Sequence, residues 1–519
     1  MGLFSSSAAA RVSGSLLTWT ACGLIAAAAC ILHARFMVPN HDNDWLLIAA
    51  ERMLAGGHYW VDFIEINPPL IVILNIPPVI LAHLTGTALY TGFSLYVAGL
   101  ILLSAALFAR WLRTCLDTDR GLIGLALVGY VGILALEPGY EFGQREHLFV
   151  ILFTPGLLWF AMREAGYQPA FDVPALVAIV LAAIAVLIKP FFLLVVAVLV
   201  LLRCRRLRDW RAIADPFVAI IAVMAALYAA VIVLWQPQYL EEAALGSEVY
   251  FAWNRSWFTV LSAARDAASV LALAVVVTVF APVSTRLRTV LASIVVPAAV
   301  FIVVAVIQKK GWVYHLLPVV ELSLIALLLV AVVLLPRLGE AMIGRGRTLA
   351  VLAAIGLETG VLFVRPAYEM VHEASRARYA ERPFITTLRR LVAGRSYLLI
   401  GSGYQWGIPS MIDGTLAARQ PGQVLLPGTL PLAAGDARQR ATAARLQSII
   451  VSELVSDLER YRPVIVAVDT NEQKQALPDN FDLLGYFTAS PEFRRVWASY
   501  ERTESIPGWD FYRLRTPAG

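Results

Sequence analysis

The sequence has few charged side chains and very few lysines. Of its 519 residues, 15% are charged, whereas about 25% is usual for a soluble protein. The four lysines are Lys189, Lys309, Lys310 and Lys474. The formal net charge of +5 comes mainly from arginines in several separate clusters rather than one basic surface, so we expect no nucleic-acid partner.

Cysteine patterns and nucleotide-binding loops are also missing. The four cysteines lie in or beside apolar segments without CxxC spacing, at Cys22, Cys30, Cys115 and Cys204. The sequence therefore predicts neither a disulfide framework nor a cysteine-based metal site. The stretch 401–403 (Gly-Ser-Gly) lacks the spacing of a dinucleotide-binding loop, which excludes that kind of site.

Apolar residues are abundant and make up 59% of the chain. They occur in blocks of about 15 to 25 residues, long enough to cross a hydrocarbon layer about 30 Å thick. We predict eleven spans, at 15–36, 90–110, 121–137, 148–164, 174–188, 191–202, 214–234, 257–281, 289–307, 317–335 and 348–364. A further apolar segment at 69–86 contains Asn75 and several prolines, which argue against a straight lipid-facing helix.

Arginine-rich loops indicate how the spans are oriented, because short cytoplasmic loops accumulate Lys and Arg. These loops lie at 109–120, 203–211, 286–288 and 336–347. We expect a multi-pass protein of the bacterial inner (cytoplasmic) membrane. With eleven spans, its N-terminus would be cytoplasmic and its C-terminus periplasmic. This topology puts Lys189, Lys309 and Lys310 on the periplasmic side, where the orientation rule disfavours them.

The composition changes after residue 365, where the chain becomes charged and rich in turn residues. Residues 395–407 and 462–470 have the pattern of buried strands, 435–460 that of a helix, and 493–515 that of a strand or hairpin pair. We therefore expect an all-α polytopic membrane domain of about 11 helices at 1–365, with its first periplasmic loop at 38–68. A small soluble α/β domain at 366–519 would follow.

Two carboxylates, Asp42 and Asp44, come directly after the first predicted span. A carboxylate at this position can serve as a general base or bind a divalent cation. Alternatively, Asp42, Asn43 and Asp44 cap the helix that follows, because Asp and Asn accept hydrogen bonds from free backbone N–H groups.

The second periplasmic loop contains four ionisable residues: Glu141, Arg145, Glu146 and His147. Ionisable groups this close to the membrane are costly unless they are paired or wetted, which makes them functional candidates. The simpler interpretation is that Arg145 forms an ion pair with a glutamate and pins the loop.

The periplasmic lysines suit a phosphate ligand. Lys189, Lys309 and Lys310 are compact positive charges, and a phosphate near the bilayer needs such counter-charges. Tyr314 and His315 follow within a few residues. The alternative for each lysine is snorkelling, in which the stem lies in lipid and the ammonium reaches the interface.

The first loop resembles that of the GT-C superfamily of membrane glycosyltransferases, in the branch related to aminoarabinose transferases and protein O-mannosyltransferases. The resemblance covers about residues 15–365. An acidic residue, a helix ending in glycine and a Tyr-x-x-Asp-(x)5-Pro-Pro sequence occur at Asp42, Gly56, Tyr59, Asp62, Pro68 and Pro69. The segments at 187–190 and 309–318 also resemble recurring elements of these enzymes.

The resemblance implies an inverting transfer of a hexosyl or pentosyl group from a polyprenyl-phosphate-linked donor to an envelope lipid, glycan or protein. It implies that Asp42, or Asp44 if the register slips, is the general base. Relatives usually have Asp-Glu where this chain has Asp42-Asn43, so a divalent cation is possible and the metal is unknown.

The implied roles extend to a larger set of residues. Cations near the leaving phosphate stabilise the negative charge that develops on it. The predicted donor-phosphate residues are Lys189, Lys309, Lys310, Arg145, His315 and Tyr314. The predicted supporting residues are Glu141, Glu146, His147, Asp62 and Glu65.

The main alternative is a transporter or flippase of a lipid-linked or anionic substrate, surrounded by membrane lipids. That class predicts inverted repeats and charges near the midplane. The sequence shows no internal repeat, and its charges collect near one face of the membrane. The glycosyltransferase hypothesis requires the polar clusters to meet at one periplasmic cavity.

Overall fold

The computed structural model describes residues 5–116, 118–339, 375–402 and 407–515, together with 352–357 and isolated positions between 349 and 372. The chain divides into two compact units. The first comprises Met1–Arg35, Ser94–Ala229 and Arg255–Glu373, and the second comprises Phe36–Phe93, Ala230–Asn254 and Ala374–Gly519. About half of the predicted span at 348–364 and the predicted domain boundary at 365 lie outside the described residues.

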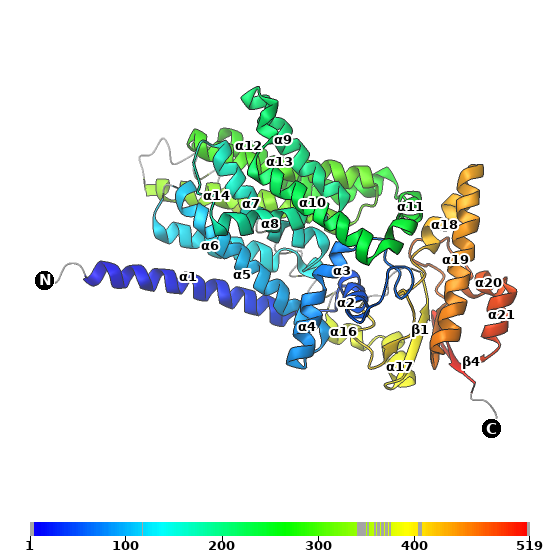
Figure 1. The fold of residues 1–519 in the computed structure, drawn as a ribbon. Coiled ribbons are helices and arrows are strands. Elements are labelled where there is room, and N and C mark those ends of the chain that lie inside the picture. The colour runs from blue at the N-terminus through cyan, green and yellow to red at the C-terminus, as the bar shows by residue number, and fades with distance from the viewer. Residues whose placement is uncertain are drawn as a thin grey trace. The chain divides into compact units, whose positions relative to one another are not determined.

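The first unit is built from long apolar helices (Figure 1). Their bounds are α1 (Ser5–Ile31), α5 (Leu89–Cys115), α6 (Arg120–Leu136), α7 (Arg145–Glu164), α8 (Val173–Leu187), α9 (Leu193–Leu207), α10 (Pro216–Trp235), α12 (Trp257–Phe280), α13 (Thr285–Gln308) and α14 (Leu317–Leu334). Within the described part of the chain, six helices are long and apolar enough to cross a membrane. The protein is thus a multi-pass membrane protein, and the total of eleven spans stays a prediction.

Helix α7 is the most buried helix that carries candidate site residues, and it packs against α8, α13 and α14. A Cβ atom at Gly156 in α7 would lie 2.7 Å from the carbonyl oxygen of Ala178 in α8. The missing side chain therefore allows the two helix backbones to approach closely, as small residues do between membrane helices. This packing fixes the start of α7, where Arg145, Glu146 and His147 lie.

The second unit combines loop helices with a mixed α/β fold. Its loop helices are α2 (His41–Leu54), α3 (Leu70–Leu74), α4 (Ile76–Thr85) and α11 (Pro237–Ala252). The segment at 69–86 forms two short helices that meet at Asn75, so the prediction that it is not a straight helix is confirmed. The remaining helices are α16 (Arg376–Ala380), α17 (Pro383–Val392), α18 (Leu426–Ala433), α19 (Ala437–Tyr461), α20 (Leu483–Thr488) and α21 (Pro491–Trp497).

A five-stranded sheet lies at the core of residues 396–514. Its strands are β1 (Ser396–Ile400), β2 (Thr415–Leu416), β3 (Ile465–Asp469), β4 (Tyr500–Ile506) and β5 (Trp509–Leu514), in the order β2-β1-β3-β5-β4. The first three strands in that order are parallel, and β5 pairs antiparallel with β3 and β4. Parallel strands covered on both faces are apolar throughout, and all five residues of β3 are buried.

The sequence patterns located most of this sheet. β1, β3 and α19 occupy the predicted strands and helix, whereas residues 493–497 belong to α21 rather than to a strand. The β4–β5 hairpin turns at Pro507-Gly508. Gly508 has φ +82°, the left-handed value that a type II turn requires after proline.

Candidate functional site

Cationic and aromatic side chains gather in the first unit. Arg145 begins α7, Lys189 precedes the short helix η3 (Pro190–Phe192), and Lys310 precedes η5 (Val313–Leu316). Arg145 and Lys189 lie against the ring of Tyr314, and Lys310 Nζ lies 6.0 Å from the ring centroid of Trp312. Both rings contact the ring of His315, which is itself buried. The structure therefore brings together four of the predicted phosphate-binding residues from three separate stretches of sequence.

The carboxylate of Glu146 lies inside this cluster. Lys189 Nζ donates a hydrogen bond to Glu146 Oε1 over 2.6 Å, and His315 Nε2 lies 3.8 Å from the same oxygen. Neither ring nitrogen of His315 has a hydrogen-bond partner among the described residues. A buried imidazole without partners can bond to a ligand oxygen, because leaving its nitrogens unsatisfied is costly.

Aromatic rings hold the cations in place. The Arg145 guanidinium lies 5.5 Å and Lys189 Nζ 5.4 Å from the ring centroid of Tyr314, and Arg145 also donates to the Tyr314 hydroxyl over 3.4 Å. Trp312 stacks on Tyr314 with 5.6 Å between centroids. Such cation–π contacts fix the direction of the charges without neutralising them.

The burial of two lysines argues against snorkelling. Lys189 and Lys310 are 8% and 1% exposed, whereas a snorkelling lysine extends its ammonium to the interface. Burial also lowers the pKa of Lys310 to about 8. Lys309 differs, since it is half-buried and lies 4.8 Å from the ring centroid of Trp257. Snorkelling remains a suitable description for Lys309.

His147 makes its contacts away from the cations. Its Nδ1 accepts a hydrogen bond from the Gly143 N–H, and its Nε2 lies 2.8 Å from the carbonyl oxygen of Leu134 in α6. These contacts join the start of α7 to α6, so His147 helps to position α7. Glu141 is half-buried in the turn just before α7.

Sequence reasoning missed Glu321. This carboxylate lies in α14, and His147 Nε2 is 3.6 Å from its Oε1. Both side chains are fully buried, and within the described ranges neither oxygen of Glu321 accepts a hydrogen bond. A signal was present, because Glu321 is the single charged residue in the apolar run 317–335.

In the second unit, Asn40 caps α2. Its Oδ1 accepts hydrogen bonds from the N–H groups of Asp42 and Asn43 over 3.0 and 3.4 Å. The capping role suggested by the sequence therefore falls to Asn40.

Asp44 bonds to Ser410. Asp44 accepts a hydrogen bond from the Ser410 N–H over 3.1 Å and another from the Ser410 hydroxyl. Burial raises the pKa of Asp44 to about 6, although the two bonds from Ser410 oppose the shift. Asp42 is 7% exposed, and its Oδ1 lies 3.6 Å from His41 Nε2. The geometry thus gives both oxygens of Asp44 a structural contact.

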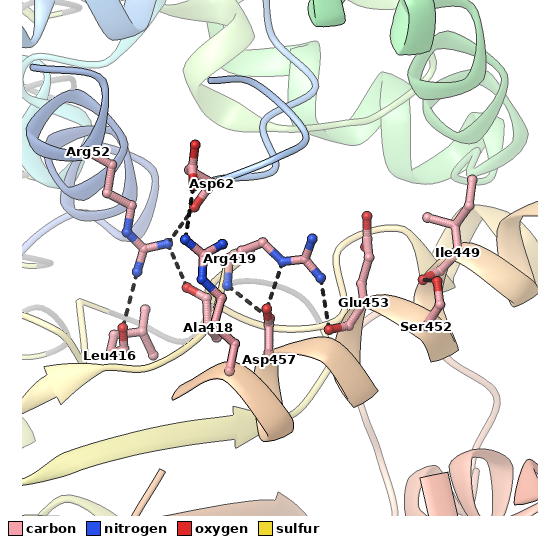
Figure 2. A network of polar contacts seen from close by, with 10 residues as sticks. Arg52, Asp62, Leu416, Ala418, Arg419, Ile449, Ser452, Glu453 and Asp457 are labelled. Atoms are coloured by element: carbon pink, nitrogen blue, oxygen red, sulfur yellow. Dashed lines mark hydrogen bonds and ion pairs between the residues drawn. The ribbon is translucent and has the colours of Figure 1, made fainter. Parts of the chain in front are cut away.

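Asp62 belongs to a network around Arg52 (Figure 2). Arg52 Nη1 donates to the carbonyl oxygens of Asp62 and Ala418 over 3.1 and 2.7 Å, and Nη2 donates to that of Leu416 over 3.1 Å. The Asp62 carboxylate accepts from the His58 N–H and from Arg460. These bonds tie the first loop to the strand β2 region.

A second arginine continues the network (Figure 2). Arg419 donates from Nε to Asp457 over 2.7 Å and from Nη2 to the Glu453 carbonyl over 2.9 Å, and its own carbonyl accepts from the Ile64 N–H. Burial raises the pKa of Glu453 to about 8. These contacts also hold the loop in place.

Glu65 is held locally. Its Oε1 accepts hydrogen bonds from the N–H and the Nδ2 of Asn67 over 2.8 and 2.6 Å. In the part of the chain that the structure describes, no group of three or more His, Cys, Asp or Glu side chains could hold a metal ion.

The fold of this chain is similar to that of two solved structures. Two crystal structures of ArnT from Cupriavidus metallidurans share this fold, one in the apo state (TM-score 0.54) and one bound to undecaprenyl phosphate (TM-score 0.53). Each is 13% identical in sequence and aligns over 99% of this chain and 100% of the ArnT chain. No protein-family model and no curated protein sequence matches the chain. The resemblance seen in the sequence is thus confirmed as a likeness of fold.

Proposed function

We propose that the protein is an integral-membrane glycosyltransferase. It moves a sugar from a polyprenyl-phosphate donor to an envelope lipid, glycan or protein on the periplasmic face of the bacterial inner membrane. The observation that carries the proposal is the buried cluster of Arg145, Lys189, Lys310 and His315 in a chain whose fold is similar to that of ArnT. An ArnT structure with the same fold is bound to undecaprenyl phosphate, which supports a donor of this chemistry.

The cationic cluster would receive the donor phosphate. When the glycosidic bond breaks, negative charge develops on the phosphate, and fixed cations stabilise it best where water is excluded. Lys189 and Arg145 are held in place by Tyr314, and His315 has two unpartnered nitrogens among the described residues. Glu146 balances the charge of Lys189 when no phosphate is bound.

Asp42 would act as the general base. In an inverting displacement the acceptor oxygen attacks the anomeric carbon and its proton passes to the carboxylate. The phosphate leaves from the opposite face with the electron pair of the broken bond. Asp44 is the second candidate, but both of its oxygens bond to Ser410. The proposal requires Asp42 to reach the same donor molecule as Lys189.

One observation favours the transporter or flippase as a second candidate function. Glu321 and His147 are ionisable, fully buried and close together inside apolar helices. Such groups often mark a path for ions or substrates across a membrane.

Deletion in the native host tests the proposal. We expect mass spectrometry of envelope lipids, glycans and proteins to show the loss of one sugar from one molecular species. Wild-type protein and the Arg265→Gln variant should restore the sugar, since Arg265 is exposed and pairs with its neighbour Asp266. Lys189→Gln should not restore it. An unchanged envelope profile together with altered uptake of a solute would replace the glycosyltransferase with the transporter.

A further inference from the structure

A pocket opens at the carboxyl ends of the parallel strands β1 and β3, within the second unit. Its volume is about 410 Å³, inside the range of small-molecule sites. Ser402 follows β1, Asp469 ends β3, and Pro383 and Phe384 begin α17. Ligands of open α/β sheets commonly bind at this edge, where loops follow the strand ends.

The pocket contains polar groups that suit hydroxyls. Ser402 is 2% exposed, and its Oγ has no hydrogen-bond partner among the described residues. Asp469 accepts from the N–H and Nδ2 of Asn471 over 3.0 and 2.7 Å, and both bonds end on Oδ1. Among the described donors none bonds to Oδ2, so that oxygen can accept a ligand hydroxyl. A ligand that bonds to Ser402 would also remove the cost of an unsatisfied buried group.

The pocket also carries a net positive charge. Arg382 and Lys474 line it together with one acidic residue, Asp469. It includes the first residues of α17, and no side chain caps that helix. The first N–H groups of a helix have no acceptor within the helix and favour an anion. A ligand with one acidic group would match this charge.

Aromatic rings form the apolar part of the pocket. Phe384 and Trp509 stack with 3.9 Å between ring centroids, and Tyr379 lies beneath Arg382, whose guanidinium is 4.5 Å from the Tyr379 ring centroid. The C–H face of a sugar ring packs well on such rings, while its hydroxyls pair with carboxylate and amide groups such as Asp469 and Asn471.

We propose that this pocket binds a saccharide that carries an acidic group. The acidic group would lie against Arg382, Lys474 and the start of α17. The ring would pack on Phe384 and Trp509, and the hydroxyls would bond to Asp469 and Ser402. The pocket lies wholly in residues 379–509, so the proposal does not depend on the transferase activity proposed above.

Binding to the full-length protein in detergent tests this proposal. The probes are glucuronate, glucose and inorganic phosphate, and their binding is measured by saturation-transfer NMR and calorimetry. We expect glucuronate to bind at least 10-fold more tightly than either of the other two. Arg382→Gln and Phe384→Ala should each weaken glucuronate binding at least 10-fold. The matched control is Arg390→Gln, because Arg390 lies on α17, the helix that contains Phe384, and is exposed and paired with Glu504.

Several outcomes would overturn the proposal. Equal binding of glucose and glucuronate would remove the role of the acidic group. Equal binding of phosphate and glucuronate would leave a simple anion site. Absent glucuronate binding, or binding unchanged in both variants, would remove the site altogether. Arg382 is exposed, so its variant reports on binding even if Phe384→Ala fails to fold.

Discussion

Lys189 and Glu146 form a buried ion pair with 2.6 Å between Nζ and Oε1. A buried pair gains little net stability over apolar residues, because both charges lose their hydration. The pair is therefore more simply explained by ligand binding, with Glu146 as the counter-charge that a phosphate replaces. Neutralising one partner or the other should then change phosphate affinity in opposite directions.

Lys189→Gln should weaken the binding of undecaprenyl phosphate by about 10-fold or more, the effect of losing about 1.4 kcal/mol of interaction. Glu146→Gln should strengthen it several-fold, since the competing carboxylate is gone. Native mass spectrometry of the purified protein measures both, with Arg265→Gln as the control. Weaker binding in Glu146→Gln would show that Glu146 organises the site rather than competing with the ligand.

Asp42→Asn and Asp44→Asn should have different effects. Asp42→Asn should abolish sugar transfer with little change in melting temperature, because an amide cannot take the acceptor proton. Asp44→Asn should keep measurable transfer, since an asparagine can still accept from the Ser410 N–H. Transfer assays and thermal melts on the same preparations compare the two. Near-normal transfer by Asp42→Asn would assign the base to another residue.

Arg52→Lys should destabilise the second unit. Lysine cannot reproduce the fork that reaches the carbonyls of Asp62, Leu416 and Ala418, and each buried carbonyl left unsatisfied costs about 1–3 kcal/mol. We expect a lower melting temperature and faster proteolysis between residues 55 and 68. Arg445→Lys is the control, because Arg445 is exposed and pairs with Glu242. Equal melting of the two variants would argue against the Arg52 network.

Glu453→Gln should stabilise the protein at alkaline pH. Burial raises the pKa of Glu453 to about 8, with Asp457 and Glu242 adding to the shift and Arg419 opposing it. The folded state then holds its proton more tightly than the unfolded state, so this glutamate costs stability as pH rises from about 4.5 to 8.

The measurement is the difference in the free energy of unfolding between Glu453→Gln and wild type across this pH range. The difference should be small at pH 5, grow toward pH 8 by on the order of 1.4 kcal/mol per pH unit, and then level off. Glu459→Gln provides the control on the same helix, since Glu459 is half exposed and pairs with Arg495. A difference that does not change with pH would mean that Glu453 titrates normally.

Local patterns predicted much of the fold. The prolines and Asn75 in 69–86 broke that segment into α3 and α4, because these residues disrupt helix geometry over a single turn. The apolar strands β1 and β3 were also visible, since burial on both faces leaves a continuous apolar run. Residues 493–497 form a helix instead of the predicted strand, because a short segment with scattered apolar residues fits either pattern and the cap from Ser490 decides for a helix.

The site was less accessible to sequence reasoning. Charge and position in the sequence predicted the candidate residues, but they did not predict which residues these candidates contact. Ser410 lies 366 positions from Asp44, and Glu146 lies 43 positions from Lys189. Glu321 was overlooked, although its charge stands alone in an apolar run. No rule of sequence spacing predicts contacts between residues as far apart as Asp44 and Ser410 or Glu146 and Lys189.

The sequence by itself determined that this chain crosses a membrane many times, because hydrophobicity and the need to satisfy backbone hydrogen bonds in lipid act along short segments. It also determined which residues are ionisable and close to the apolar runs. Only the tertiary structure decided that Lys189 pairs with Glu146, that Asn40 rather than Asp42 caps α2, and that Asp44 bonds to Ser410. Such pairings depend on how distant segments pack, and each is favourable only after that packing has excluded water.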